Sequence, residues 1–378
     1  MPRWLAGQVV IWGGGFALLR VFVVPAERCP SVDAGAVRAA VANASAWLVR
    51  NEQPDGSFLY GYYRGERRVS HEYSDARHGG VLFALYRVGE TAAADKGLGW
   101  VQRRLVVHDD WSAFAGDVAE PEVGANALVV AGLMYRRRVT GDDRYDALAK
   151  RMGRFLVSQM RPDGSVLEFW SPSTRRPVPG VFGKFATGEA FYALTLLNNE
   201  FPGEGWDAPA HRVADYLANR RDEAEGSLTR QPDHWASYGL SELAETGLNE
   251  TEIAFARRLA GYFGYEIRFI SQHTGRPLNM FTESGADFGV VGEASTALWK
   301  ASALDPRLAD LHDQLASRVT CLAGITVGRQ TPASDPDPRA AGAWFYHGYT
   351  QMDDQQHSIG ALLGAEKVLD ASESNRAP

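Results

Sequence analysis

The segment Gly-Glu-Ala-Phe-Tyr-Ala-Leu at residues 188–194 has a close copy, Gly-Glu-Ala-Ser-Thr-Ala-Leu, at residues 292–298. A third copy, Gly-Gly-Val-Leu-Phe-Ala-Leu, occupies residues 79–85. Looser copies complete a set of six, at residues 125–131, 234–240 and 356–362. The second positions of the copies are 46 to 64 residues apart, at Gly80, Asn126, Glu189, Trp235, Glu293 and His357. Self-similarity at this spacing indicates a repeat architecture, and each unit has room for two helices.

The two helices of each unit differ in character. The repeated segments are small and apolar nearly all round, which is typical of helices buried on most faces. The segments between them are amphipathic; in residues 143–159, Tyr145, Leu148, Met152 and Phe155 recur at helical spacing. Buried helices alternating with half-buried ones predict two concentric rings. We therefore expect one all-α toroid of six helical hairpins over residues 31–370.

Turn signals follow the amphipathic helices. Gln-Pro-Asp-Gly-Ser at 53–57 and Arg-Pro-Asp-Gly-Ser at 161–165 are turn sequences, because proline presets φ and glycine accepts a positive φ. A looser version, Glu-Ala-Glu-Gly-Ser, occupies 223–227. Aromatic segments follow the first two turns at 58–63 and 166–170, and we expect short hairpins there at the rim of the ring.

Composition narrows the class of protein. The chain of 378 residues is 45% hydrophobic and 22% charged with a net charge of −7, the balance of a globular protein. No basic run could neutralise several phosphates, which argues against a nucleic-acid partner. Cys29 and Cys321 lack the spacing of a zinc site. In a closed ring the first and last helices are neighbours, so a disulfide in an oxidising compartment and two buried thiols are both open.

The N-terminal segment 4–24 is apolar and follows Arg3, which is typical of a signal peptide or a signal anchor. Arg20 interrupts the segment and no good cleavage site follows it, so we expect an uncleaved membrane anchor in residues 1–30. The alternative is a helix packed on the toroid. An anchor implies an extracytoplasmic domain in the cell envelope, and we expect the polar tail 371–378 to be frayed.

The helix and turn at residues 47–58 (Trp-Leu-Val-Arg-Asn-Glu-Gln-Pro-Asp-Gly-Ser-Phe) and the Gly-Glu-Ala helices resemble the (α/α)6 six-hairpin glycosidase-like superfamily. This superfamily includes glycoside hydrolases, unsaturated uronyl hydrolases, polysaccharide lyases and sugar epimerases. The resemblance covers residues 35–370 and implies a carbohydrate substrate, without assigning a catalytic pair. The turn also resembles that of terpene cyclases and protein prenyltransferases, which build a similar double ring.

The loops that enter the inner helices should meet at one mouth of the ring. Glycosidases need a carboxylic acid and a second carboxylate, and these loops supply many carboxylates. Our candidates for catalysis are Asp75, Glu189, Asp233 and Asp354. Further carboxylates at the mouth are Glu72, Glu122, Glu283, Glu293 and Asp353. Most of these must have other roles, because aspartates before a helix are commonly N-caps and glutamates in a first turn are favoured by the helix dipole.

The segment 344–357 is the richest in candidate chemistry. Its aromatic residues offer flat faces for sugar rings, and at most one of the consecutive Asp353 and Asp354 should face the cavity. Arg77 and Lys184 could pair with a substrate carboxylate, although ordinary salt bridges explain either one. The candidate substrate-binding residues are His71, Arg77, His78, Asn126, Lys184, His234, Trp235, Glu293, Trp344, Tyr346, Tyr349 and His357. The histidines are scattered without a ligand spacing, so we expect no metal and no other cofactor.

Three functions are weighed. The first is an extracytoplasmic enzyme that acts on a poly- or oligosaccharide by hydrolysis, elimination or epimerisation through paired carboxylates. It would fail if the mouth were a narrow apolar cavity with a single acid. The second is a terpene cyclase-like enzyme, although no Asp-x-Asp-Asp motif occurs. The third is a non-catalytic glycan-binding protein of the envelope.

Overall fold

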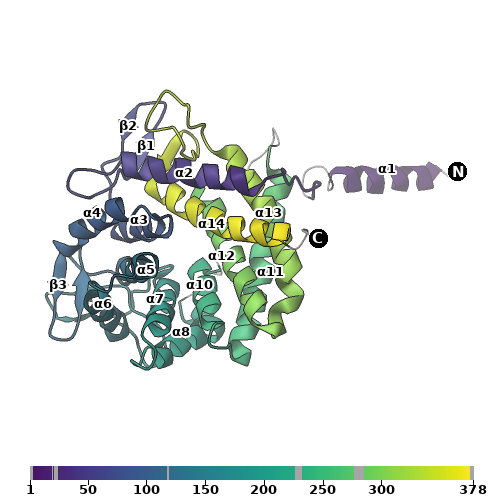
Figure 1. Cartoon of the computed structure of the whole chain (residues 1–378). Helices are drawn as coiled ribbons and strands as arrows, with labels where there is room; N and C mark the ends of the chain where they lie inside the picture. The colour runs from purple at the N-terminus through teal and green to yellow at the C-terminus, as the bar shows by residue number, and fades with distance from the viewer. Residues whose placement is uncertain are drawn as a thin grey trace.

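The structure, a computed structural model, describes residues 3–18, 20, 24–116, 119–225, 232–275 and 285–374. Six helices form an inner ring: α3 (Asp75–Arg87), α5 (Val123–Thr140), α7 (Ala186–Glu200), α10 (His234–Leu243), α12 (Gly285–Leu304) and α14 (Met352–Ser374). Each contacts the next, and α14 contacts α3, which closes the ring (Figure 1). Every repeat copy falls on one of these helices, so the predicted all-α toroid is confirmed.

An outer layer packs on this ring. Its helices are α2 (Ala34–Arg50), α4 (Thr91–Gln102), α6 (Asp146–Ser158), α8 (Asp207–Asn219), α11 (Glu250–His273) and α13 (His312–Arg329). Short elements join them, the helix α9 (Arg221–Ala224) and the 3-10 helix η3 (Pro306–Leu311). Every residue of α10 is buried, whereas α6 buries one face that includes Met152 and Phe155. The alternation predicted from hydrophobic patterning is therefore present.

Three small antiparallel sheets lie at the rim. The strand β1 (Gly61–Tyr63) pairs with β2 (Arg68–Val69) and with β7 (Tyr349–Gln351), β3 (Leu105–Val107) pairs with β4 (Ser112–Phe114), and β5 (Trp170–Ser171) pairs with β6 (Arg176–Pro177). The predicted hairpins after the first two turns are confirmed. Gly56 and Gly164 have φ of 88° and 89°, which only glycine adopts easily. The third turn, at 223–227, lies partly outside the described residues.

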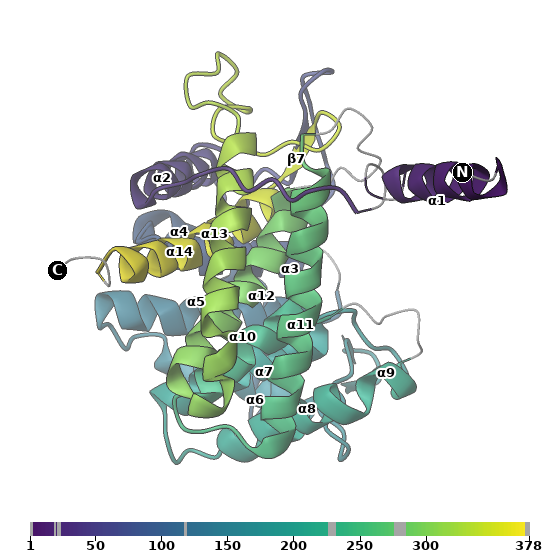
Figure 2. The same ribbon diagram turned by 90° about the vertical axis from the view of Figure 1, so that its right-hand side faces the viewer.

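The two ends of the chain differ from expectation. The helix α1 (Arg3–Leu18) lies apart from the ring in Figures 1 and 2, with Ile11 and Trp12 67% and 73% exposed, so it is not packed on the toroid. Within the described ranges, no helix is both long enough and apolar enough to cross a bilayer, and residues 1–2, 19 and 21–23 of the predicted anchor lie outside those ranges. At the other end α14 runs to Ser374, so only 375–378 of the expected tail lie outside the described residues.

Residues 24–33 fasten the N-terminal side of the domain to the outer layer. A disulfide joins Cys29 to Cys321 on α13, which decides between the two alternatives left open by the sequence. The backbone N–H of Arg28 donates to the Ser271 carbonyl of α11 at 2.9 Å. Residues on both sides of the predicted boundary at residue 30 thus belong to a segment that contacts α11 and α13.

Candidate active site

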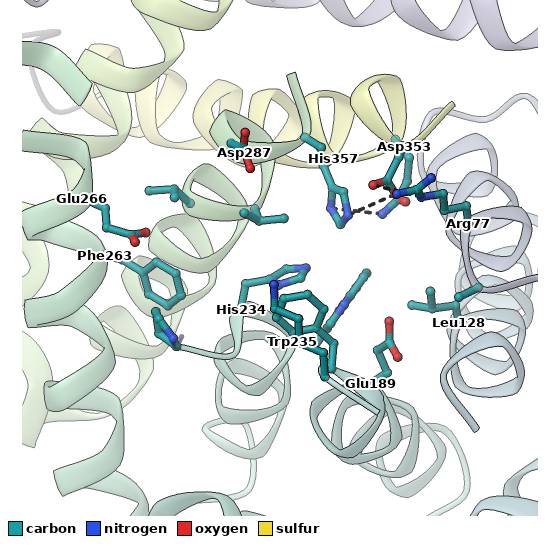
Figure 3. A pocket seen from close by; sticks show the side chains of 18 of the residues that line it. Arg77, Leu128, Glu189, His234, Trp235, Phe263, Glu266, Asp287, Asp353 and His357 are labelled. Atoms are coloured by element: carbon teal, nitrogen blue, oxygen red, sulfur yellow. Dashed lines mark hydrogen bonds and ion pairs between the residues drawn. The ribbon is translucent and has the colours of Figure 1, made fainter. Parts of the chain in front are cut away.

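A cavity of about 920 Å³ opens where the N-terminal ends of the inner helices converge (Figure 3). The first turns of α3, α7, α10, α12 and α14 line it, together with the second half of the outer helix α11. This is the mouth predicted from the repeats. The cavity carries several acids, bases and aromatic rings, so it is not the narrow apolar cavity with one acid that would have excluded a carbohydrate enzyme.

A charged pair marks one side of the cavity. Arg77 on α3 lies 3.3 Å from the carboxylate of Asp353 on α14. Arg77 also donates to the Tyr60 hydroxyl and, at 2.5 Å, to Oε1 of Gln351. Ser74 caps α3 by accepting a hydrogen bond from the Arg77 backbone N–H. The guanidinium is thus held at the cavity wall by partners from two distant segments of the chain, at residue 60 and at residues 351–353.

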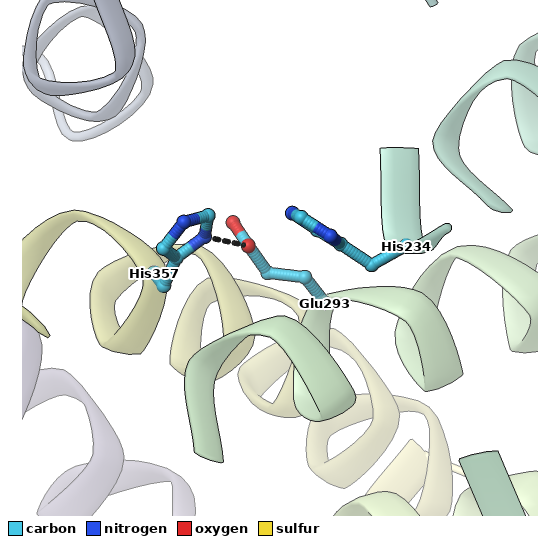
Figure 4. A group of neighbouring side chains, drawn as sticks. All are labelled: His234, Glu293 and His357. Atoms are coloured by element: carbon cyan, nitrogen blue, oxygen red, sulfur yellow. Dashed lines mark hydrogen bonds and ion pairs between the residues drawn. The ribbon is translucent and has the colours of Figure 1, made fainter. Parts of the chain in front are cut away.

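His357 on α14 lines the cavity, and Figure 4 shows the carboxylate of Glu293 between its imidazole ring and that of His234. Its Nδ1 shares a 2.6 Å hydrogen bond with Oε2 of Glu293, and Tyr238 donates to the other oxygen of that carboxylate at 3.0 Å. Its Nε2 lies 3.6 Å from Asp353. Burial opposes protonation of His357, but Glu293 and Asp353 outweigh it and raise its pKa above the usual value. The geometry therefore favours an imidazolium.

His234, at the start of α10, has the opposite character. Its ring centre lies 5.1 Å from that of His357, in an edge-to-face arrangement. Its Nε2 is buried and has no hydrogen-bond partner among the residues that the structure describes. Burial, and then the charges of His357 and Lys184, lowers the pKa of His234 well below its usual value. The two imidazoles therefore favour different protonation states, as a base and an acid require.

Glu189 on α7 lines the cavity beside Trp235 (Figure 3). Burial, and then the carboxylates of Glu168 and Glu122, raises its pKa well above the usual value. Burial and Glu122 raise the pKa of Glu168 to about 8, and burial also raises that of Glu122. These three glutamates form a buried acidic cluster that favours protonated carboxyl groups and keeps Glu189 neutral.

Glycines make room for the acidic side chains of this end of the ring. A methyl group on Gly124 would overlap the Glu189 carboxylate, and one on Gly360 would overlap that of Glu293. A methyl group on Gly188, the first residue of the repeat at 188–194, would likewise overlap the carboxylate of Asp233. The small residues thus have a second purpose besides helix convergence, because each leaves space for a carboxylate of another segment.

The ring is an (α/α)6 toroid. Among solved structures, the chain is similar to a cellobiose 2-epimerase from Spirochaeta thermophila, with a TM-score of 0.62 at 14% identity over 90% of this chain and 97% of that one. It is similar to a D-mannose isomerase, with a TM-score of 0.59 at 12% identity over 88% and 97% of the two chains. An α-1,6-mannanase of Salegentibacter sp. HEL1_6, an inactive variant bound to mannotetrose, gives 0.60 at 11% identity over 89% and 100%.

These similarities confirm the resemblance to the (α/α)6 six-hairpin glycosidase-like superfamily at the level of the fold. No family model matches the sequence, and no curated protein matches it. Identities of 8 to 14% leave the chemistry to be argued from the cavity itself.

The structure brings six of the residues predicted for the site into the cavity: Arg77, Lys184, Glu189, His234, Trp235 and His357. Glu293 does not line the cavity but hydrogen-bonds His357 directly. The consecutive aspartates divide as expected, with one facing the cavity, but it is Asp353 that does so. Asp354 is 1% exposed and accepts hydrogen bonds from the backbone N–H groups of Ala286 and Gln351.

The other two candidate catalytic aspartates also do not line the cavity. Asp233 caps α10 through Trp235 and Ala236 and pairs with Arg221 at 3.0 Å, as the capping alternative predicted. Asp75 accepts a hydrogen bond from the Gly116 backbone, and its neighbour Ser74 is the residue that caps α3. Both carboxylates have structural partners that explain their positions.

The remaining candidates for substrate binding lie away from the cavity. His78 is fully buried between Tyr73 and the Gly97 carbonyl, and burial lowers its pKa to about 3. Asn126 hydrogen-bonds both backbone groups of Phe114, which ties β4 to α5. Three others lie in the core or at the rim: Trp344, which donates to the Thr326 carbonyl, Tyr346, and Tyr349, which stacks on Tyr63.

A second cavity of about 660 Å³ lies beside the β1–β2 hairpin and is lined by His71, Glu72 and Tyr60. The hydroxyl of Tyr60 bonds to Arg77 of the first cavity. Of the other carboxylates considered, Glu122 belongs to the buried acidic cluster, and Glu283 lies outside the described residues.

Sequence reasoning did not select the cavity-lining residues of α11, nor Glu168 in the acidic cluster. The α11 residues are Tyr262, Phe263, Tyr265, Glu266, Phe269 and Ile270. Their signal was an aromatic-rich stripe at helical spacing, which also describes any outer helix packed on an inner one.

His234, Glu293 and His357 form the one group of three potential metal ligands within the described residues, with ligand atoms within 4.8 Å of one another. Zinc would take ligands at about 2.0–2.2 Å. Here Glu293 instead binds His357 directly at 2.6 Å, and the Arg87 guanidinium lies 3.8 Å from the same carboxylate. A histidine oriented by a carboxylate is the simpler interpretation of this contact.

Proposed function

We propose that the protein is a carbohydrate-active enzyme that isomerises a reducing sugar by moving a proton next to its carbonyl group. The observation that carries the proposal is the pair His234 and His357, two imidazoles in one cavity whose environments shift their pKa values in opposite directions. Groups shifted apart in this way are suited to act as base and acid. The glycan-acting enzymes that share the fold support the substrate class.

Isomerisation takes two pairs of proton transfers between the substrate and the two histidines. Neutral His234 removes the proton from the carbon beside the carbonyl, while protonated His357 donates to the carbonyl oxygen, which gives a neutral enediol. His234 then returns its proton to the former carbonyl carbon, and His357 recovers its proton from the hydroxyl group on the neighbouring carbon, which converts an aldose into a ketose and restores both imidazoles. Glu293 stabilises the imidazolium of His357 and orients the ring. Arg77 and Asp353 lie on the same side of the cavity, placed to bind hydroxyl groups.

The spacing of the imidazoles favours isomerisation over epimerisation at a single carbon. A carbon attacked from both faces would lie about 3–3.5 Å from each nitrogen, which separates the two nitrogens by about 6–7 Å and the ring centres by more. The ring centres are 5.1 Å apart and edge-to-face. Two groups this close are suited to adjacent atoms on one side of the substrate.

The test is to incubate the protein with aldohexoses in D2O and to follow the sugar protons by NMR. We expect deuterium at the carbon beside the carbonyl and the appearance of a ketose. His234→Asn should abolish both, whereas His71→Asn, in the second cavity, should leave both unchanged. No exchange with any aldose would overturn the proposal.

Glycoside hydrolysis is the second candidate function, and neutral Glu189 favours it as a general acid. Asp353 would be the second carboxylate, on the other side of the cavity (Figure 3). This function predicts new reducing ends from oligosaccharides, lost in Glu189→Gln and unaffected in His234→Asn. That pattern of losses separates it from isomerisation.

We also propose that the domain works outside the cytoplasm. The disulfide between Cys29 and Cys321 supports this location, because disulfides persist in oxidising compartments. The measurement is thiol labelling of the protein from its native cells. Two free thiols in the freshly lysed cells would contradict the proposed location.

A further inference from the structure

The cavity is larger and less uniform than a single sugar requires. Its volume of about 920 Å³ is close to the upper end of the roughly 300–1,000 Å³ typical of pockets for drug-sized ligands. In Figure 3, Arg77 and Asp353 lie on one side of His234, whereas Phe263 and Glu266 of α11 lie on the other. The charged pair and the histidines therefore use only part of the space.

The part beside α11 has an apolar surface. Phe263 and Ile270 on α11 are buried, and Val290 and Val291 on α12 line the cavity near them. We define these four residues with Phe269 as the apolar wall. Ile270, Val290 and Val291 have no flat face on which a sugar ring stacks, and none of the five side chains, Phe263 and Phe269 included, can hydrogen-bond a sugar hydroxyl group.

Two carboxyl groups border this wall, and both already have partners. Glu266 hydrogen-bonds Tyr262 on the same helix, and Asp287 also has a partner. Tyr262 and Tyr265 are 39% and 67% exposed, so the wall continues to the open surface. An apolar group bound here can extend toward solvent without leaving the cavity.

We infer that the substrate is a reducing sugar that carries an apolar acyl chain, bound along the apolar wall while the sugar lies at the histidines. This inference rests on the proposed function. Isomerisation requires a free carbonyl group, so the acyl chain must be attached to a hydroxyl or amino group elsewhere on the sugar. A second sugar ring is the competing occupant, since it could stack on Phe263 or Phe269, and the titration below compares it directly with an acyl chain.

The experiment is calorimetric titration with glucose, mannose and galactose and with their 6-O-octanoyl esters, alongside cellobiose and mannobiose. We expect at least one ester to bind about tenfold or more tightly than its parent sugar, since each buried CH2 contributes roughly fourfold. Phe263→Ala and Phe269→Ala should each remove most of this gain. Tyr346→Ala, at the rim and outside the cavity, should retain it.

The outcomes separate the inference from the proposed function. Esters that bind no better than their parents, or a disaccharide that gains where the esters do not, would overturn the inference even if aldoses exchange deuterium. A gain for the esters that is lost in the Phe269 variant, without any exchange, would uphold the apolar wall and contradict the isomerase. Phe269 is only half-buried, so its variant remains a test if Phe263→Ala fails to fold.

Discussion

The two sides of the cavity have different origins in the chain. The charged side is built by first turns of inner helices, where Arg77, Asp353 and His357 are fixed by hydrogen bonds from neighbouring segments. The apolar wall comes largely from the second half of one outer helix, α11, and its residues are held by packing. Chemistry on the first side needs fixed geometry, whereas an apolar wall needs only shape. We therefore expect the two sides to respond differently to substitution.

The largest difference should appear in turnover. His357→Asn removes the proposed acid and should lower kcat for a plain aldose by about 10²- to 10⁴-fold with little change in KM. Phe269→Ala should leave kcat for the same aldose within about twofold and raise KM only for acylated sugars. Steady-state kinetics on the matched sugars measure both. Equal losses of kcat in the two variants would show that the sides do not have separate roles.

The disulfide tests how the apolar wall is supported. Residues 24–33 connect Cys321 of α13 with the end of α11 through Cys29 and Arg28. Cys29→Ser should lower the free energy of unfolding by about 2–4 kcal/mol, measured in urea. Hydrogen exchange should increase in α11 more than in α14. The double variant with Cys321→Ser should match the single one, because the same bond is lost; a further loss would mean that the thiols matter separately.

The pH profile tests the charged side. His234 must be neutral and its pKa is lowered, so we expect the acid limb of kcat/KM below pH 6.5, the usual value for histidine. His357 must be protonated and its pKa is raised, so the alkaline limb should lie above pH 6.5. Each limb should fall up to about tenfold per pH unit. Glu293→Gln should move the alkaline limb to lower pH. If the limb does not move, it does not report the titration of His357.

Much of the fold was predictable because each inner helix carries one copy of the repeat. A helix buried on all sides must be small and apolar, and a ring of six must repeat that pattern, so the mouth could be located before any side chain was placed. Which of Asp353 and Asp354 faces the cavity depends on where α14 begins after β7. Pairing of β7 with β1, far away in the sequence, fixes that point.

The site residues that the sequence analysis did not select lie outside the repeated segments. Glu168 belongs to a rim segment, and it reaches the acidic cluster only because residues 166–170 fold back against Glu122. The stripe of α11 has the spacing of an ordinary outer helix, and no local feature shows that a cavity replaces its expected neighbour. Both depend on long-range contacts that a periodic pattern does not contain.

Glu168 gives a smaller, thermodynamic test of the acidic cluster. Its pKa rises from the usual 4.5 to about 8 in the folded state, so the folded protein binds more protons than the unfolded chain over that interval. Stability should therefore fall as pH rises from 4.5 to 8 and should be fully present only below 4.5. Glu168→Gln should reduce the difference in Tm between pH 5 and pH 8 by a few degrees. An unchanged slope would show that Glu168 is ionised throughout.

The smallest expected effect is that of removing divalent metals. Dialysis against EDTA should change turnover by less than about twofold, because Glu293 is hydrogen-bonded to His357 and Arg87 lies beside it, which disfavours a second cation. Metal analysis of the protein before and after dialysis provides the control. A loss of activity restored by one metal would assign His234, Glu293 and His357 to a metal site instead. The charged side of the cavity would then act through a Lewis acid, whereas the apolar wall and its preference for acylated sugars would be unaffected.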